Sequence, residues 1–140
     1  MIRPLMIVAA SLLALPSIAA SDLAELEPTA VAGMIDVTSF PNSIESRRDE
    51  GYRTFADYGF TDIELVDRTV ELYEDDRSWM FGITVLGGSD DQVVLCVLDT
   101  ALGGPTYHTQ DAIAFQVGEG GFLVATGGTI QDPACPHIGE

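Results

Sequence analysis

The sequence predicts an α+β fold, in which one main helix packs on an antiparallel meander of about five strands in a single domain. Apolar residues recur at helical spacing shortly after residue 41, which indicates an amphipathic helix. Short segments of alternating apolar and polar residues then follow one another between turn-forming residues, which is typical of strands joined by hairpins. No internal repeat and no long linker divides the chain, so one domain is expected.

Residues 1–20 have the layout of a secretory signal peptide. Arg3 precedes an apolar run over residues 5–15, and Pro16 and several small residues lead to an expected cleavage near Ala20. The run is shorter than the roughly 20 residues that a membrane span requires, so no stable membrane insertion is expected. This layout predicts a periplasmic or secreted protein, and a buried N-terminal helix is the alternative.

Residues 21–40 are expected to form a flexible or partly ordered lead-in, and residues 41–140 the folded domain with its C-terminal tail. The main helix is expected at about residues 42–58, with Asn42 as its N-cap and Gly59 as its C-terminal cap. A glycine inside this range, at position 51, costs about 1 kcal/mol in a helix interior. The helix face that should pack on the sheet consists of Ile44, Tyr52 and Phe55.

The strand patterns fall after this helix. The segment 92–100 is apolar on both faces, so it is expected to be a central, covered strand. Trp79 lies on the apolar face of its segment and is expected to pack under the helix; a binding patch with Tyr73 or Tyr107 is the alternative. The segments with strand-like patterns are residues 63–65, 69–73, 79–86, 92–100, 112–117 and 122–126, and the last two flank a GEGG turn that is typical of a hairpin.

The order of helix, turn and strands between residues 47 and 103 resembles that of PepSY domains. The segment GFTDIELV is similar to the turn that follows the helix of those domains, and Asp99 and Gly103 stand where their meander ends. No diagnostic motif accompanies the resemblance, and the later hairpin and the two cysteines lie outside the pattern. The resemblance implies an exported interaction module or a module that regulates a peptidase.

The charge of the chain excludes several classes of partner. There are 22 acidic and 6 basic residues, every basic residue is an arginine, and the formal net charge is −16. Such a charge repels phosphate backbones and anionic lipids, so nucleic acid is not an expected partner. The absence of lysine excludes Schiff-base catalysis and a lysine-dependent phosphate loop. A basic protein surface is the partner that this charge favours.

No arrangement of residues predicts a catalytic site, a bound metal or another cofactor. Carboxylates are numerous enough for some pair to act as acid and base, so a small hydrolase is one alternative. A loose copper or zinc site formed by His108 and His137 is another. The two cysteines and two histidines together lack the spacing of a zinc finger or ribbon; they are Cys96, His108, Cys135 and His137.

A disulfide between Cys96 and Cys135 is the one specific site that the sequence predicts. Export brings the chain to an oxidising compartment, where two cysteines without a third normally pair. Cys135 lies between Pro133 and Pro136 in a tail with no other visible anchor. The closed loop of about 40 residues corresponds to a stabilisation of up to about 4 kcal/mol in the chain-entropy estimate. His137 is expected to be an exposed neighbour of the bond.

These observations favour a small, exported, acidic binding or inhibitory module without catalytic activity. Its charge would suit a basic protein surface as partner, and the alternative is that the charge only keeps the protein soluble. A carboxylate-dependent hydrolase and a periplasmic metal-binding protein that uses His108 and His137 are the alternatives.

Overall fold

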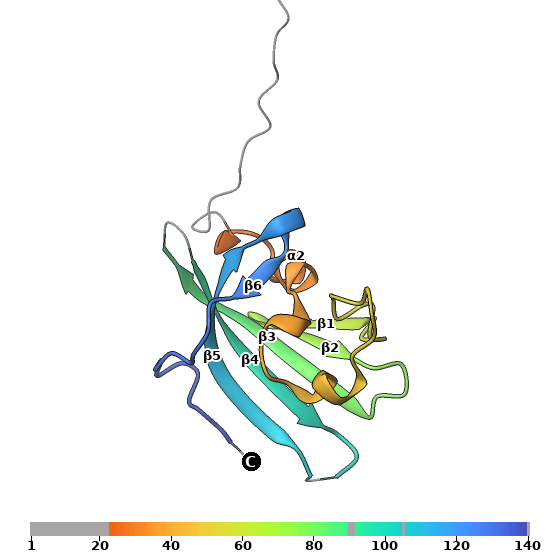
Figure 1. Cartoon of the computed structure of the whole chain (residues 1–140). Coiled ribbons are helices and arrows are strands. Elements are labelled where there is room, and N and C mark those ends of the chain that lie inside the picture. Colours follow the sequence, from red (N-terminus) through yellow and green to blue (C-terminus); the bar gives the residue numbers. More distant parts are fainter. Residues whose placement is uncertain (1–22, 90–91, 105, 140) are drawn as a thin grey trace, which may run out of the picture.

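The computed structural model describes residues 23–89, 92–104 and 106–139, and the predicted signal peptide lies outside them. Six antiparallel strands form one sheet in the order of the sequence (Figure 1). The α+β class is confirmed at this coarse level, but the sheet has six strands rather than about five, because each of the six segments with a strand-like pattern contributes a strand, the last of only three residues.

The strands are β1 (Asp62–Val66), β2 (Thr69–Tyr73), β3 (Trp79–Gly88), β4 (Val93–Ala101), β5 (His108–Val117) and β6 (Leu123–Ala125). The sheet is accompanied by one α-helix, α2 (Pro28–Met34), and by the 3₁₀ helices η1 (Val37–Ser39), η2 (Ser43–Arg47) and η3 (Glu119–Gly121).

β4 lies inside the sheet and is covered on both faces. It pairs with β3 on one side and with β5 on the other. Leu95 and Cys96 point to opposite faces because they are neighbours in a strand, and they are 0% and 7% exposed. The prediction of a central, covered strand is therefore confirmed. We call the face that carries Leu95 the inner face and the face that carries Cys96 the outer face.

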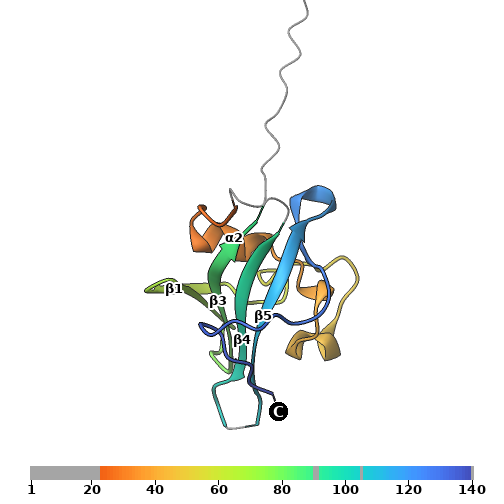
Figure 2. The same ribbon diagram turned by 90° about the vertical axis from the view of Figure 1, so that its left-hand side faces the viewer.

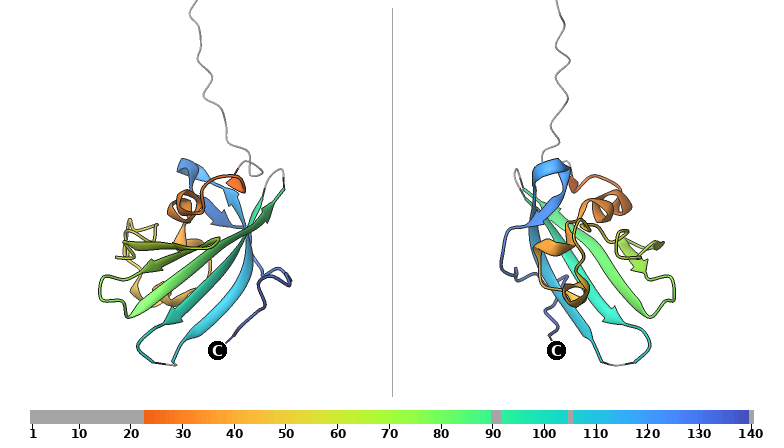
Figure 3. Two further views of the ribbon diagram at one scale, coloured as in Figure 1. Left: turned by 180° about the vertical axis from the view of Figure 1, so that it is seen from behind. Right: turned by 45° about the vertical axis from the view of Figure 1, so that its right-hand side comes forward.

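The segment before β1 crosses the inner face (Figure 3). α2 packs against β2 and β3, and Pro28 stands in its first turn, where the missing N–H leaves no helix hydrogen bond unmade. Residues 21–40 were expected to be a flexible or partly ordered lead-in. The described part of it, residues 23–40, supplies six of the nine buried apolar side chains that precede β1. These nine are Leu23, Val31, Ala32, Ile35, Val37, Phe40, Ile44, Phe55 and Phe60.

The expected helix at about residues 42–58 is wrong. Asn42 does cap a helix, because its side-chain oxygen accepts a hydrogen bond of 2.9 Å from the N–H of Ile44, but that helix is η2, with only five residues. Gly51, which lies inside the expected helix, has a φ angle of 87°, which no α-helix contains. The φ angle of 89° at Gly59 is compatible with the C-terminal cap that was expected there, so it does not argue against a helix. The apolar spacing that suggested a helix carries no information about the backbone angle at Gly51.

A side chain also competes with the helix. The carboxylate of Asp57 accepts hydrogen bonds from the N–H groups of Arg53 at 2.8 Å and Thr54 at 2.9 Å, which folds this segment into a turn. Phe55 is nevertheless buried as expected, with 1% exposed, whereas Tyr52 is 44% exposed. The predicted apolar face is thus correct at Ile44 and Phe55, which are both 1% exposed, and wrong at Tyr52.

The C-terminal tail after β6 covers part of the outer face and runs beside β5 (Figure 2). The predicted disulfide is present and joins Cys96 of β4 to Cys135, with Cα atoms 5.6 Å apart. The tail also pairs with β5, since Gln110 and Ile138 exchange two N–H to carbonyl hydrogen bonds of 2.9 Å each. The tail is therefore held to the sheet by a covalent bond and by main-chain hydrogen bonds.

Candidate functional site

The sulfur atoms of the four-donor zinc set are not available to a metal. Cys96 and Cys135 share a disulfide, whereas zinc requires thiolates. Within residues 23–89, 92–104 and 106–139, no group of three or more histidine, cysteine, aspartate and glutamate side chains is placed to hold a metal ion.

His108 and His137, the donors of the looser metal site, are not brought together. His108 begins β5, and its Nδ1 atom is 3.1 Å from the hydroxyl of Thr100. His137 has a side chain that is 70% exposed, and its Nδ1 atom is 2.5 Å from a carboxylate oxygen of Asp111. His108 and Asp111 are three residues apart in β5, so their side chains point to opposite faces. The structure pairs His137 with a carboxylate instead of with His108.

A cavity of about 630 Å³ lies beside the pair of His137 and Asp111, and most of its lining comes from residues 129–137 of the tail. Its lining includes the imidazole of His137 and the carboxylates of Asp111 and Asp132. One oxygen of Asp132, however, accepts the N–H of Ala134 at 2.9 Å and thereby forms the turn that leads to the disulfide. The polar groups of this cavity are explained by the fold of the tail.

Asp99 is the most deeply buried carboxylate in the part of the chain that the structure describes, with 2% exposed. It accepts hydrogen bonds of 2.7 Å from the N–H and the hydroxyl of Ser43, and one of 2.6 Å from Nε1 of Trp79. Burial raises the pKa of Asp99, against the lowering effect of these bonds and of one from Tyr107. Ser43 belongs to η2, whereas Asp99 and Trp79 belong to the sheet, so the hydrogen bonds of Asp99 fasten η2 to the sheet.

Trp79 was expected to be a core residue under a helix. It is only half-buried, at the margin of the core, and its ring lies 5.3 Å from that of Tyr107. The expectation is therefore correct in placing Trp79 against the core and wrong about the helix above it.

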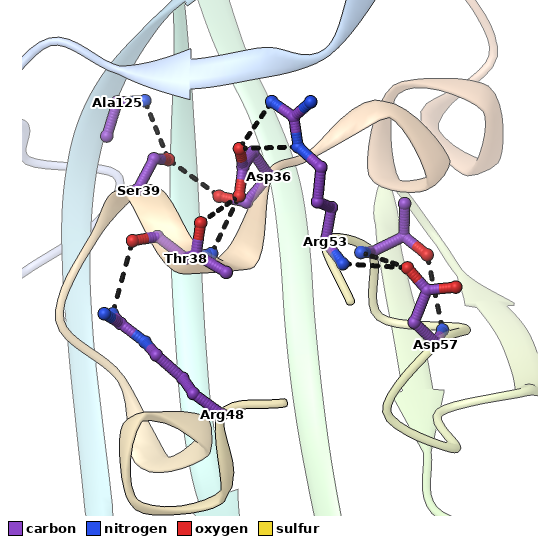
Figure 4. A network of polar contacts seen from close by, with 8 residues as sticks. Asp36, Thr38, Ser39, Arg48, Arg53, Asp57 and Ala125 are labelled. Carbon is purple, nitrogen blue, oxygen red and sulfur yellow. Dashed lines mark hydrogen bonds and ion pairs between the residues drawn. The ribbon is translucent and has the colours of Figure 1, made fainter. Parts of the chain in front are cut away.

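Asp36 is the centre of a second interior network (Figure 4). One carboxylate oxygen accepts hydrogen bonds from Nε and Nη2 of Arg53 at 3.1 and 2.8 Å, and the other accepts two from Thr38 at 2.9 and 2.6 Å. Burial acts to raise the pKa of Asp36, but these bonds outweigh it and hold the pKa below its usual value. The hydroxyl of Ser39 donates to the main-chain carbonyl of Asp36 at 2.7 Å and accepts the N–H of Ala125 at 2.9 Å, so the network also fastens β6.

β1 is the outer strand at the edge of the sheet away from the tail (Figures 1 and 2), and it pairs with β2 alone. Of the seven most exposed large apolar residues among those described, Ile63, Leu65 and Val66 lie in this five-residue strand. Ile63 stands opposite Leu72, which is 3% exposed, and Leu65 opposite Val70, which is fully buried. The apolar inner face thus continues to an edge that remains half uncovered, and we call β1 the open edge.

Carboxylates surround the open edge. The segment 62–77 contains seven of them and two arginines, which gives a net charge of −5. Arg77 bridges the first two, because its Nη2 atom is 2.6 Å from an oxygen of Asp62 and 2.9 Å from one of Glu64. We call these seven carboxylates the acidic strip: Asp62, Glu64, Asp67, Glu71, Glu74, Asp75 and Asp76.

The acidic strip is held in place by aromatic and polar contacts. The guanidinium of Arg77 lies 4.3 Å from the ring centroid of Tyr73. The hydroxyl of Tyr73 donates to Glu71, and this bond, with a smaller contribution from burial, raises the pKa of Tyr73 to about 12. The arginine and the tyrosine hydroxyl are therefore already engaged, and the strip keeps an excess of negative charge.

No protein-family model, curated protein or solved structure matches this chain, so the resemblance to PepSY domains receives no support. The missing helix at about residues 42–58 also departs from the order of elements in that pattern. In the described parts of the chain, no helix combines the length and the apolar character that crossing a membrane requires.

Sequence reasoning recognised Ile63 and Leu65 as strand residues but did not identify them as an exposed site. Their alternation with acidic residues was a usable signal, because charged residues are typical of strands at a sheet edge. The position of a strand in the sheet decides whether its apolar face is covered, and alternation alone does not reveal that position.

Proposed function

We propose that this protein is a small, exported, acidic interaction module without catalytic activity, which binds a basic protein surface. The observation that carries the proposal is the coincidence of the open edge with the acidic strip. The uncovered side chains of Ile63 and Leu65 provide apolar area to bury, and the surrounding carboxylates select a cationic partner.

The deeply buried carboxylates support a binding module rather than a hydrolase. Asp99 and Asp36 accept hydrogen bonds from their own chain and fasten the inner segment to the sheet. Most of the acidic strip, in contrast, lies on the surface: Asp62 and Glu64 have side chains that are 45% and 48% exposed, whereas Glu74, at 16%, is largely buried and paired with Arg47. Negative charge is therefore presented to solvent beside an uncovered edge.

The proposal is tested with the chain that begins at Ser21 and with labelled polylysine and polyglutamate as probes. Fluorescence anisotropy should show saturable, salt-sensitive binding of polylysine and none of polyglutamate. The double variant Glu64→Gln/Asp67→Asn should weaken binding about two- to tenfold, given the usual size of exposed charge pairs.

The matched control is Glu50→Gln/Glu119→Gln, which removes the same charge at two exposed positions outside the acidic strip. It should weaken binding less than the first variant does. Equal weakening by the two variants would show that only the total charge matters, and absence of polylysine binding at low salt would contradict the proposed function.

A further inference from the structure

The hairpin between β1 and β2 determines which main-chain groups of the open edge face solvent. Val66 and Thr69 are paired and are separated by a loop of two residues. In such a hairpin the pair that flanks the loop exchanges its hydrogen bonds, and pairs then alternate along the strands. Glu64 and Val66 therefore direct their N–H and C=O groups to β2, whereas Ile63 and Leu65 direct theirs outward.

The outward groups belong to the residues whose side chains extend the inner face. Ile63 and Leu65 are 50% and 53% exposed, although their partners across β2 are buried. A strand added beside β1 would satisfy the outward N–H and C=O groups of both residues. In an antiparallel pair, the residues directly opposite them would project their side chains on the same face, so apolar residues at those positions would complete the cover.

The intervening residues of such a strand would meet negative charge. On the outer side of β1, Asp62 and Glu64 share a single arginine, Arg77, and Glu71 of β2 adds a further carboxylate nearby. Lysine or arginine side chains at the intervening positions would therefore complement this surface.

We propose that the open edge accepts an extended segment of a partner protein as a seventh, antiparallel strand, in which apolar residues alternate with lysine or arginine. This inference rests on the proposed function and specifies how the basic partner is bound. Main-chain hydrogen bonds to Ile63 and Leu65 supply part of the binding energy, and the alternation of side chains supplies the specificity.

A second copy of the chain is a poor occupant of the same edge. Antiparallel self-pairing over all five residues of β1 is centred on Glu64, and it places the Glu64 carboxylates of the two copies opposite each other. Each copy also carries a net charge of −16, which opposes association. The charges that exclude a second copy are the ones that favour a cationic strand.

The experiment uses short synthetic peptides that contain only valine and lysine. One peptide alternates the two residues, and a second has the same composition with all lysines before all valines. We expect the alternating peptide to bind at least about tenfold more tightly, a difference of about 1.4 kcal/mol in binding free energy. Binding of the alternating peptide should also slow amide exchange at Ile63 and Leu65.

Methylation of the peptide main chain tests the hydrogen bonds directly. In antiparallel pairing the valines stand opposite Ile63 and Leu65, so their N–H groups point to β1, and those of the lysines point away. N-methylation of the valines should therefore weaken binding at least about tenfold, and N-methylation of the lysines much less. Equal effects at both sets of positions would overturn strand addition.

Variants of the protein locate the site. Leu65→Thr keeps a strand-forming residue but removes apolar area, and it should weaken binding of the alternating peptide. The matched control is Val117→Thr at the end of β5, a residue that is 42% exposed and lies outside the open edge. If the two peptides bind equally and with the same salt dependence, strand addition is wrong and the proposed function stands. If neither binds at low salt, both are wrong.

Discussion

At one edge of the sheet β5 is covered by β6 and the tail, whereas at the other edge β1 has neighbours on one side only. The covered edge has main-chain partners along most of β5, including the hydrogen bonds between Gln110 and Ile138. The open edge exposes about half of the side chains of Ile63 and Leu65. The two edges thus differ in how they treat the main-chain N–H and C=O groups of a strand: β5 has them paired by other segments, and β1 leaves about half of them facing solvent.

The covered edge depends on a covalent bond because the tail buries little apolar surface. Cys135 is the only buried residue in the described part of the tail, residues 126–139. Hydrophobic burial therefore contributes little to holding the tail, and the disulfide takes its place. The open edge instead carries charge, which discourages pairing between copies and still allows a partner of opposite charge.

Removal of the disulfide should have the largest effect and should act on the covered edge. The double variant Cys96→Ala/Cys135→Ala should lower the free energy of unfolding by up to about 4 kcal/mol, because the unfolded chain loses its crosslink. Urea unfolding of the variant and the parent protein measures the difference. Binding of the alternating peptide to the folded variant should be unchanged, because the open edge lies away from the tail.

A loss of stability below about 1 kcal/mol would contradict this account, and would mean that hydrogen bonds alone hold the tail. A loss of peptide binding in a variant that is still folded would show that the two edges are coupled.

Replacement of Asp36 should have the next largest effect on the free energy of unfolding, because the network around Asp36 fastens β6 at the covered edge. Asp36→Asn removes the charge that Arg53 and Thr38 stabilise, and should cost about 1–3 kcal/mol at neutral pH. The pKa of Asp36 is lowered in the folded protein, so its contribution is present above the unfolded pKa. It is lost as the pH falls through the folded pKa, and the variant and parent should converge in strong acid.

The matched variant at the open edge is Asp62→Asn. Asp62 also pairs with an arginine, Arg77, but both side chains are more than 40% exposed, at 45% and 47%. Its replacement should cost less than about 1 kcal/mol and the cost should shrink further with added salt. Urea midpoints at several pH values compare the two variants, and an equal cost at neutral pH would remove the distinction between the edges.

The sequence was informative where a local pattern determines the outcome. The segments that became β2 and β3 alternate clearly, the segment that became β4 is apolar on both faces, and two cysteines leave one possible pairing. The prediction of a helix at about residues 42–58 failed because Gly51 adopts a positive φ angle and Asp57 folds residues 53–57 into a turn, and helical spacing reports neither. The open edge was not predicted because it depends on strand order, a property of the whole sheet.

Amide exchange should distinguish the edges residue by residue. In the native protein, Ile63 and Leu65 should exchange quickly because their N–H groups face solvent, whereas Glu64 should be protected by β2. Gln110 should be protected by Ile138 of the tail. Reduction of the disulfide should then speed exchange at Gln110 and leave Ile63 and Leu65 unchanged. Protection of Ile63 in the free protein would mean that another segment already occupies the open edge.

The smallest expected effect concerns the hairpin that supports the open edge. Asp67, the first residue of the two-residue loop, has a φ angle of 55°, in the left-handed region that favours glycine. Asp67→Gly should therefore raise the free energy of unfolding by about 0.5 kcal/mol, because relief of backbone strain is partly offset by the greater freedom of glycine in the unfolded chain. Asp67→Ala is the control, since it removes the same charge but keeps the Cβ atom, and it should give no gain. If alanine stabilises the protein as much as glycine does, the benefit comes from reduced repulsion within the acidic strip, and the open edge is limited by its charge rather than by its turn.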